Sequence, residues 1–224
     1  MFLISDNVSQ HRSTVRSAGI GKRHRSKRVF DIFFSLAALI FLAPALALIA
    51  VALLIVDGRP IIYRHERIGR NGQPFACLKF RTMRKDADRA LAELLEREPA
   101  RLAEWTRTQK LMDDPRVHRL GRYLRISSAD ELPQLINVLK GAMSVVGPRP
   151  IVLEELNRYG PHVSCYLAMT PGITGLWQIS RSKNACYEER VHLDVEYFHK
   201  RSLARDLAII WKTFGVVFFA QNEK

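Results

Sequence analysis

The sequence predicts one domain, mainly helical with a few short strands, that carries a single membrane-embedded helix. Three observations support this fold class. Residues 32–56 form an uninterrupted apolar run, residues 60–80 contain two strand-like segments, and residues 132–139 and 202–220 carry apolar side chains at helical spacing. The chain has 224 residues, of which 47% are hydrophobic, and this is enough for one domain with its own packed core.

The apolar run indicates a membrane segment. It spans 25 residues, of which only Ser35 and Pro44 are not plainly apolar, and Asp31 and Asp57 bracket it. About 20 apolar helical residues cross the hydrocarbon core of a bilayer. The run is too long for the apolar region of a secretory signal peptide, and no convincing cleavage site follows it.

Pro44 and the flanking charges favour a segment that enters and leaves the membrane on the cytoplasmic side. Proline kinks a helix, and Pro44 lies at the midpoint of the run. Both flanks are rich in Lys and Arg, which favours the cytoplasm for both. Each half of such a hairpin would be about 18 Å long. A straight single-pass helix with a tolerated proline is the alternative. The basic residues are Lys22, Arg23, Arg25, Lys27 and Arg28 before the run and Arg59, Arg64, Arg67 and Arg70 after it.

We divide the chain into three parts on this basis. Residues 1–28 form a basic, mobile arm that lies near anionic lipid or is a tail of no consequence. Residues 29–57 form the re-entrant helix hinged at Pro44, and residues 58–224 form a cytoplasmic domain. Its last helix, over residues 202–220, is amphipathic and either lies in the membrane interface or packs on the core.

Turn signals place further elements in the cytoplasmic domain. Strands are expected at residues 60–63 and 75–80, with the Asn71-Gly72 pair as the turn between them. The helix over residues 132–139 is expected to stop at Gly141.

Net charge and cysteine content limit the function classes. The formal net charge of +13 indicates an anionic partner, which composition leaves open as nucleic acid, phospholipid head groups or phosphorylated substrates. The three cysteines are Cys77, Cys165 and Cys186. An odd number at wide spacing is typical of reduced structural thiols, and of neither a disulfide framework nor a zinc site.

Two adjacent carboxylates, Asp130 and Glu131, are the strongest candidates for chemistry. One interpretation is structural, since Ser128 and Glu131 have the spacing of a capping box at a helix start. The other is catalytic. A carboxylate at a helix N-terminus is expected to keep a low pKa and stay ionised, so that Asp130 could attack phosphorus or hold Mg²⁺.

Transfer of a phosphoryl group between two anions also needs cations that neutralise its charge. Arg125 lies five residues before Asp130 in the sequence. The other candidates for phosphate binding are Lys79, Arg81 and Arg149, each of which could equally be a solvated surface charge.

Several motifs, in order, resemble those of the bacterial sugar transferases, the monotopic phosphoglycosyl transferases. The resemblance covers about residues 27–220. Its motifs are Lys27-Arg28-Val29-Phe30-Asp31, Lys79-Phe80-Arg81-Thr82-Met83, Ser128-Ala129-Asp130-Glu131-Leu132-Pro133-Gln134-Leu135, Asn137-Val138-Leu139-Lys140-Gly141, Met143-Ser144-Val145-Val146-Gly147-Pro148-Arg149-Pro150 and Pro171-Gly172-Ile173-Thr174-Gly175-Leu176-Trp177-Gln178.

This resemblance implies a fold and a reaction. The fold is mixed α/β and mostly helical, a small catalytic domain on a re-entrant membrane helix with interfacial amphipathic helices. Asp130 is implied as the nucleophile that attacks the β-phosphate of a UDP-sugar, releases UMP and holds the sugar phosphate until a polyprenyl phosphate accepts it. Mg²⁺ lies close to Asp130, Glu131 is the partner carboxylate, and Arg125 and Arg149 bind phosphate or nucleotide. The implied setting is exopolysaccharide synthesis at the cytoplasmic face of the bacterial inner membrane.

The chain departs from the family pattern in places. A Ser-Pro hinge pair is replaced by Ala43-Pro44, and Arg181 and Lys183 follow Trp177-Gln178 where many relatives have Gly-Arg-Asn. Residues 110–117 resemble the galactose-1-phosphate transferases of exopolysaccharide systems, which favours UDP-galactose over UDP-glucose.

Two alternatives come from other functional classes. A single-pass protein with a basic domain that binds nucleic acid would explain the charge, but not the ordered motifs, so we expect no nucleic-acid partner. An inactive scaffold of the same fold is disfavoured because Asp130 and Glu131 are both present. The sequence leaves open whether the protein forms a homodimer.

Overall fold

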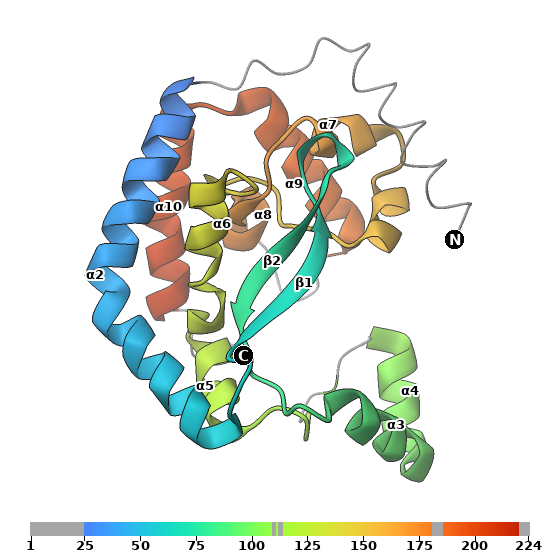
Figure 1. Cartoon of the computed structure of the whole chain (residues 1–224). Coiled ribbons are helices and arrows are strands. Elements are labelled where there is room, and N and C mark those ends of the chain that lie inside the picture. Colours follow the sequence, from blue (N-terminus) through green and yellow to red (C-terminus); the bar gives the residue numbers. More distant parts are fainter. Residues whose placement is uncertain (1–24, 109–110, 112–113, 181–185, 220–224) are drawn as a thin grey trace. The chain divides into compact units, whose positions relative to one another are not determined.

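The computed structural model describes residues 25–108, 111, 114–180 and 186–219 (Figure 1). These residues form a mixed α/β, mostly helical fold with one long apolar helix near the N-terminus, which confirms the predicted class. The elements are, with η denoting 3-10 helices, α2 (Arg25–Asp57), β1 (Ile62–Ile68), η1 (Arg70–Gly72), β2 (Pro74–Phe80), α3 (Ala87–Arg97), α4 (Pro99–Thr108), α5 (Arg119–Ile126), η2 (Ala129–Glu131), α6 (Gln134–Lys140), β3 (Ser144–Val146), η3 (Leu153–His162), α7 (Val163–Leu167), β4 (Gly172–Thr174), α8 (Leu176–Ser180), α9 (Tyr187–Lys200) and α10 (Leu203–Phe219).

The contacts divide the chain into two compact units. Unit 1 contains the chain up to Ala43, then Arg64–Leu78 and everything from Pro133 onward, and unit 2 contains Pro44–Tyr63 and Lys79–Leu132. One boundary between them falls at Pro44, inside α2. The predicted hinge at this proline stays a prediction, and most of the expected N-terminal arm lies outside the described residues.

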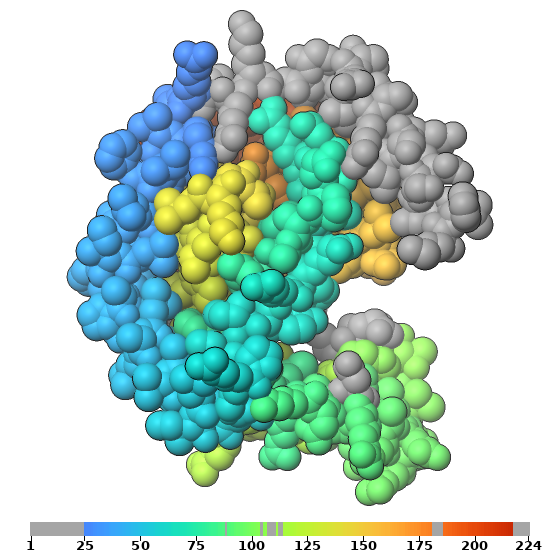
Figure 2. Space-filling view, in the orientation of Figure 1, coloured from blue at the N-terminus to red at the C-terminus, as the bar shows by residue number. Residues whose placement is uncertain are grey.

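Helix α2 is apolar and largely uncovered. It is 33 residues long and contains Pro44 without a break in its helical assignment. Only 6% of its most apolar 18-residue window is buried, and Phe41 and Ile55 are 82% and 80% exposed. The start of α2, blue in Figure 2, is open on the face that this view shows. A core helix of a soluble domain would be buried, so length, composition and exposure together favour contact with lipid.

Strands β1 and β2 pair as the predicted hairpin. The turn signal is correct, because Asn71 and Gly72 both have positive φ angles, of 57° and 70°. The first strand was placed too early, since β1 begins at Ile62 and continues to Ile68. Its polar residues between positions 64 and 67 hid it from a search for apolar runs.

The core of unit 2 lies where the second half of α2 meets β2 and α5. Leu53, Phe80 and Leu124 are buried together there, and Ile49, Ile62 and Leu120 pack against them. This packing fixes the end of β2, which carries Lys79 and Phe80, and with it the start of the segment that follows, Arg81-Thr82.

The core of unit 1 is built around two very short parallel strands. β3 and β4 pair Ser144 with Gly172 and Val146 with Thr174. The backbones touch so closely that a Cβ atom on Gly172 would lie 2.1 Å from the amide nitrogen of Gly147. Only glycine fits such a close approach of two backbones. This close approach explains why the motifs of the two loops contain glycine.

Helix α10 has two faces with different surroundings. Its inner face places Asp206, Ile209 and Ile210 in the core of unit 1. Its outer face exposes Trp211 and Phe214, at 80% and 52%. The helix therefore packs on the core and still presents an apolar stripe, and its predicted location in the membrane interface stays a prediction. The side chains of Val217 and Phe218 lie outside the described part.

Candidate active site

The two carboxylates lie on a tight turn just before α6. Asp130 and Glu131 belong to the 3-10 helix η2, and α6 begins only at Gln134. Ser128 adopts a left-handed conformation with φ 57°, and its side chain makes no capping hydrogen bond. The capping-box interpretation of Ser128 and Glu131 is therefore wrong. At its other end α6 stops at Gly141, with φ 82°, as predicted.

Lys79 reaches this turn from the end of β2. Its ammonium group donates a hydrogen bond to the Glu131 carboxylate, with Nζ 2.6 Å from Oε1. Both side chains are about a quarter exposed, at 25% and 26%. The pair joins residues 52 positions apart in the sequence, so the predicted cation and the predicted carboxylate do meet.

Asp130 is buried, at 9% exposure. Burial raises the pKa of its carboxyl group, and the neighbouring negative charge of Glu131 raises it further. The positive charges of Lys79 and Arg125 oppose that rise in the pKa but do not cancel it. The expectation of a low pKa at a helix N-terminus is therefore wrong, because desolvation outweighs the local dipole.

Arg125 stands on α5, which packs closely against the segment that follows β2. Its Nε donates to the Thr82 hydroxyl at 2.8 Å. A Cβ atom on Gly121 would lie 2.2 Å from the Thr82 carbonyl oxygen, so only glycine allows this packing. His118 caps α5 by accepting from the Gly121 amide at 2.9 Å. Together these contacts hold Arg125 within electrostatic reach of Asp130.

Arg81 is held partly by the end of α2. Its Nη2 pairs with the Asp57 carboxylate at 2.7 Å and also donates to the carbonyls of Asp57 and Gly58, at 3.0 and 2.8 Å. Its Nε and Nη1 are buried and have no hydrogen-bond partner among the described residues. The remaining nitrogen, Nη2, anchors the end of α2.

Five of the six predicted site residues thus belong to unit 2, and Arg149 belongs to unit 1. Arg149 follows β3 in a loop whose backbone is held by Arg190, which donates to the Arg149 carbonyl at 3.1 Å. Arg181 and Lys183, to which the sequence assigned no role, lie outside the described residues.

The carboxylates fit a magnesium ion that shares its coordination with a substrate. Mg²⁺ in phosphoryl-transfer sites is held by one or two carboxylates plus phosphate oxygens and water. Asp130 and Glu131 provide two adjacent carboxylates, and the raised pKa of Asp130 comes first from burial and then from the negative charge of Glu131, which a cation would offset. No three His, Cys, Asp or Glu side chains converge within the described ranges, so the fit depends on oxygens from elsewhere.

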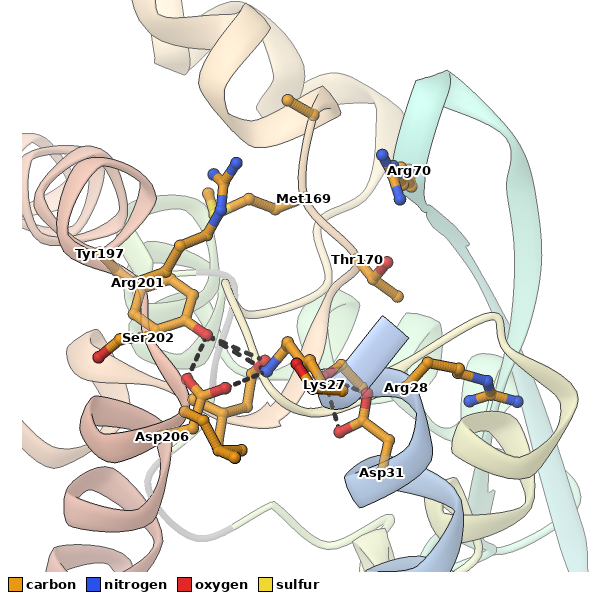
Figure 3. A pocket seen from close by; sticks show the side chains of 15 residues that line it. Lys27, Arg28, Asp31, Arg70, Met169, Thr170, Tyr197, Arg201, Ser202 and Asp206 are labelled. Atoms are coloured by element: carbon orange, nitrogen blue, oxygen red, sulfur yellow. Dashed lines mark hydrogen bonds and ion pairs between the residues drawn. The ribbon is translucent and has the colours of Figure 1, made fainter. Parts of the chain in front are cut away.

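A polar pocket in unit 1 was not predicted (Figure 3). It lies at the start of α2, where Lys27 pairs with Asp206 at 2.5 Å and Asp206 accepts from the Tyr197 hydroxyl at 2.6 Å. Asp31 accepts from the Ser144 hydroxyl at 2.8 Å and from the Val145 amide at 3.0 Å. The pocket residues tie the start of α2 to β3 and α10. Lys27 and Asp31 belong to a motif of the chain, but their partners Asp206 and Ser144 are more than 100 residues away in the sequence, so the sequence did not predict these pairs.

Comparison with known proteins places the chain in one family. The family model described as bacterial sugar transferase matches residues 22–220. The exopolysaccharide production protein ExoY of Sinorhizobium fredii is 48% identical over 197 residues, which cover 88% of this chain and 87% of the relative.

Two longer relatives match over a smaller share of their own length. The undecaprenyl-phosphate galactose phosphotransferase of Salmonella typhimurium is 47% identical over 191 residues, 85% of this chain and 40% of the relative. The UDP-glucose:undecaprenyl-phosphate glucose-1-phosphate transferase of Escherichia coli is 35% identical over 196 residues, 84% of this chain and 39% of the relative. The chain thus spans about two fifths of these two proteins.

The match to the family model extends over most of the chain and includes α2, the carboxylate turn and the loops after β3 and β4. The chain therefore belongs to the bacterial sugar transferase family, and it is a phosphoglycosyl transferase.

Proposed function

We propose that this enzyme transfers a sugar-1-phosphate from a UDP-sugar to undecaprenyl phosphate and releases UMP, as the first membrane step of exopolysaccharide synthesis. The observation that carries the proposal is the buried Asp130 beside Glu131, with Lys79 near both carboxylates and Arg125 near Asp130. Burial keeps water away from the nucleophile, and the cations offset the charge of the incoming diphosphate.

The first step uses Asp130 as a nucleophile. An oxygen of its carboxylate bonds to the β-phosphorus of the UDP-sugar, the bond between that phosphorus and the bridging oxygen breaks, and UMP leaves with the electron pair. In the second step an oxygen of undecaprenyl phosphate attacks the same phosphorus. The Asp130 carboxylate is then the leaving group, and the product is a lipid-linked diphosphosugar.

The charged neighbours of Asp130 have separate roles in this scheme. Lys79 holds Glu131 at 2.6 Å and lowers the cost of two adjacent carboxylates. Arg125 and Arg81 are proposed to bind phosphate oxygens as negative charge shifts toward UMP. Arg149 is proposed as a further phosphate or nucleotide ligand. Bound Mg²⁺ would neutralise phosphate charge next to Asp130.

Galactose-1-phosphate is the proposed cargo, and glucose-1-phosphate is the alternative. Support for galactose comes from the resemblance of residues 110–117 and from the galactose phosphotransferase at 47% identity. The glucose-1-phosphate transferase at 35% identity keeps the alternative open. Residues 109–110 and 112–113 of that segment lie outside the described ranges.

The proposed setting is the cytoplasmic face of the bacterial inner membrane, with α2 as a re-entrant helix hinged at Pro44. Support comes from the basic flanks on both sides of the apolar run and from the exposed apolar surface of α2.

The test is UMP release by the full chain purified in detergent, with Mg²⁺, undecaprenyl phosphate and a panel of UDP-sugars. We expect release from UDP-galactose that requires the lipid acceptor for turnover and is lost in Asp130→Asn. Asp130→Asn keeps the size of the side chain, so its thermal unfolding serves as the folding control. A folded, membrane-inserted wild-type protein that releases UMP from no UDP-sugar would contradict the proposal and favour a scaffold role.

A further inference from the structure

A second group of charged side chains surrounds the loop that follows β3, in unit 1. Ile68 at the end of β1 forms an antiparallel bridge with Ile151, and its amide donates to the Ile151 carbonyl at 2.9 Å. This bridge brings β1, which carries Arg67, alongside the loop that carries Arg149. The backbone of both segments is thereby fixed.

One carboxylate serves two arginines in this group. Glu155 accepts from the Val152 amide at 3.1 Å and from Nη1 of Arg190 at 3.3 Å. Nη1 of Arg67 lies 3.8 Å from the same carboxylate, too far for a hydrogen bond. Arg67 therefore shares a carboxylate that is already occupied, although its Nη2 also contacts His65 Nδ1 at 3.1 Å.

Arg190 has a structural position. It is 6% exposed, its Nη2 donates to the Arg149 carbonyl at 3.1 Å, and its guanidinium lies 5.1 Å from the centre of the Tyr187 ring. Its contacts hold the loop that carries Arg149. The Arg149 guanidinium itself is half-buried and makes no hydrogen bond or ion pair with any residue that the structure describes.

The group contains more positive than negative charge. Burial lowers the pKa of Arg67, and the positive charge of Arg149 lowers it further, so each guanidinium group lies in the electrostatic field of the other. Glu155 pairs with Arg67 and Arg190, and Asp194 is a second negative charge near Arg190, so three arginines stand against two carboxylates. Two neighbouring guanidinium groups that repel each other in a half-buried place are stabilised by an anion, and their planar donor forks match phosphate oxygens.

We propose that Arg67 and Arg149 form a two-arginine clamp that binds a phosphate or diphosphate group, with Arg190 and Glu155 as positioning residues. Arg67 is the residue that this proposal adds. The proposal deepens the proposed function, since the phosphate would come from one of its two substrates, the nucleotide-sugar or the polyprenyl phosphate. The two sources share the same phosphate chemistry, and the experiment separates them.

The experiment measures equilibrium binding to the full chain in nanodiscs. The probes are UDP, inorganic pyrophosphate and undecaprenyl phosphate. The variants are Arg67→Gln, Arg149→Gln and the double variant, with Arg67→Lys to keep the charge. Arg64→Gln is the matched control, because Arg64 lies on the same strand and is exposed. Unfolding temperatures show whether each variant is folded.

We expect Arg67→Gln to weaken binding of pyrophosphate about tenfold or more, which is the usual effect of losing a hydrogen bond between charged groups. Arg67→Lys recovers part of the loss, and Arg64→Gln changes nothing. The two arginines act on one anion, so the double variant loses less than the product of the single losses. A parallel loss for UDP assigns the clamp to the nucleotide, and a loss for undecaprenyl phosphate assigns it to the lipid acceptor.

The outcome for the clamp is separate from that for the reaction. Pyrophosphate binding that depends on Arg67 supports the clamp even where no UDP-sugar is turned over. Folded Arg67→Gln that binds all three probes as tightly as Arg64→Gln overturns it, whatever the activity.

Discussion

Asp130 combines two properties that are in tension at a single residue. A buried carboxyl group next to a second carboxylate binds its proton more tightly, yet a nucleophile must lose that proton. Lys79 and Arg125 supply the opposing positive charge. In the proposed reaction, burial and the charges of Glu131, Lys79 and Arg125 together set the pH at which Asp130 becomes reactive.

The pH dependence of the first chemical step tests this balance. The pKa of Asp130 is raised, so the rate of UMP release falls as pH drops through a value above the ordinary value of an aspartate. Glu131→Gln removes a charge that raises this pKa, so the acid limb of the pH–rate profile, where the rate falls with falling pH, moves to lower pH. Lys79→Met removes a charge that lowers it and moves the limb to higher pH.

The measurement is single-turnover UMP release in the absence of lipid acceptor, as a function of pH. The position of the limb is informative even where the maximal rate of a variant is low. Limbs that coincide in the wild type and both variants would show that another group controls the step.

Helix α5 shows how a short element positions the site. It is held against the segment after β2 by the contact of Gly121 with Thr82, and from that position it presents Arg125. The helix is not visible in the sequence, because it has only eight residues and contains a glycine.

Gly121→Ala is expected to destabilise the protein by about 1–3 kcal/mol through overpacking, and to lower activity, because the added methyl group meets backbone that cannot move away cheaply. Gly215→Ala is the matched control: it lies inside α10 with nothing within 4 Å of an added Cβ atom. We expect that control to be neutral or stabilising by about 0.5–1 kcal/mol. Chemical unfolding measures both, and equal effects would contradict the tight contact at Gly121.

Elements that follow a simple pattern could be predicted, and others could not. The apolar run, the Asn71-Gly72 turn, α6 and α10 each have a local signal of periodicity or turn chemistry. Helix α9 was missed because its buried face includes Arg190 and Asp194, which disrupt the apolar pattern. The strands β3 and β4 have three residues each, too few for a period to be read.

The same distinction applies to the site. Asp130 and Glu131 are adjacent in the sequence and belong to a motif, so the sequence alone identified them as candidate site residues. The contacts around them form only when the chain folds. Lys79 binds Glu131 from 52 residues away in the sequence, and Arg125 binds Thr82 from 43 residues away. The raised pKa of Asp130 was missed because burial is a property of the packed chain.

At the scale of the whole molecule, the account depends on how α2 sits in the membrane. Basic residues flank the apolar run on both sides, and Asp57 at the end of α2 pairs with Arg81 of the segment that follows β2. The basic flanks predict that both ends of α2 lie on the cytoplasmic side, so we expect the helix to return to the side from which it entered.

Single cysteines at both ends of α2 test this topology. In a background without Cys77, Cys165 and Cys186, we expect Ser26→Cys and Arg59→Cys to resist a membrane-impermeant maleimide in intact spheroplasts. Both are then labelled once the membrane is opened. Labelling of Arg59→Cys in intact spheroplasts would mean that α2 crosses the bilayer, and Pro44 would then be only a kink.

The central claim is that Asp130 carries the sugar phosphate covalently, and trapping that intermediate tests it most directly. The protein is mixed with UDP-galactose and Mg²⁺ without lipid acceptor, quenched in milliseconds and analysed by mass spectrometry of its peptides. We predict a hexose-phosphate adduct on Asp130 that is absent in Asp130→Asn and disappears when undecaprenyl phosphate is added before the quench. Normal turnover with no adduct at any quench time would contradict the account and favour direct transfer between the two substrates.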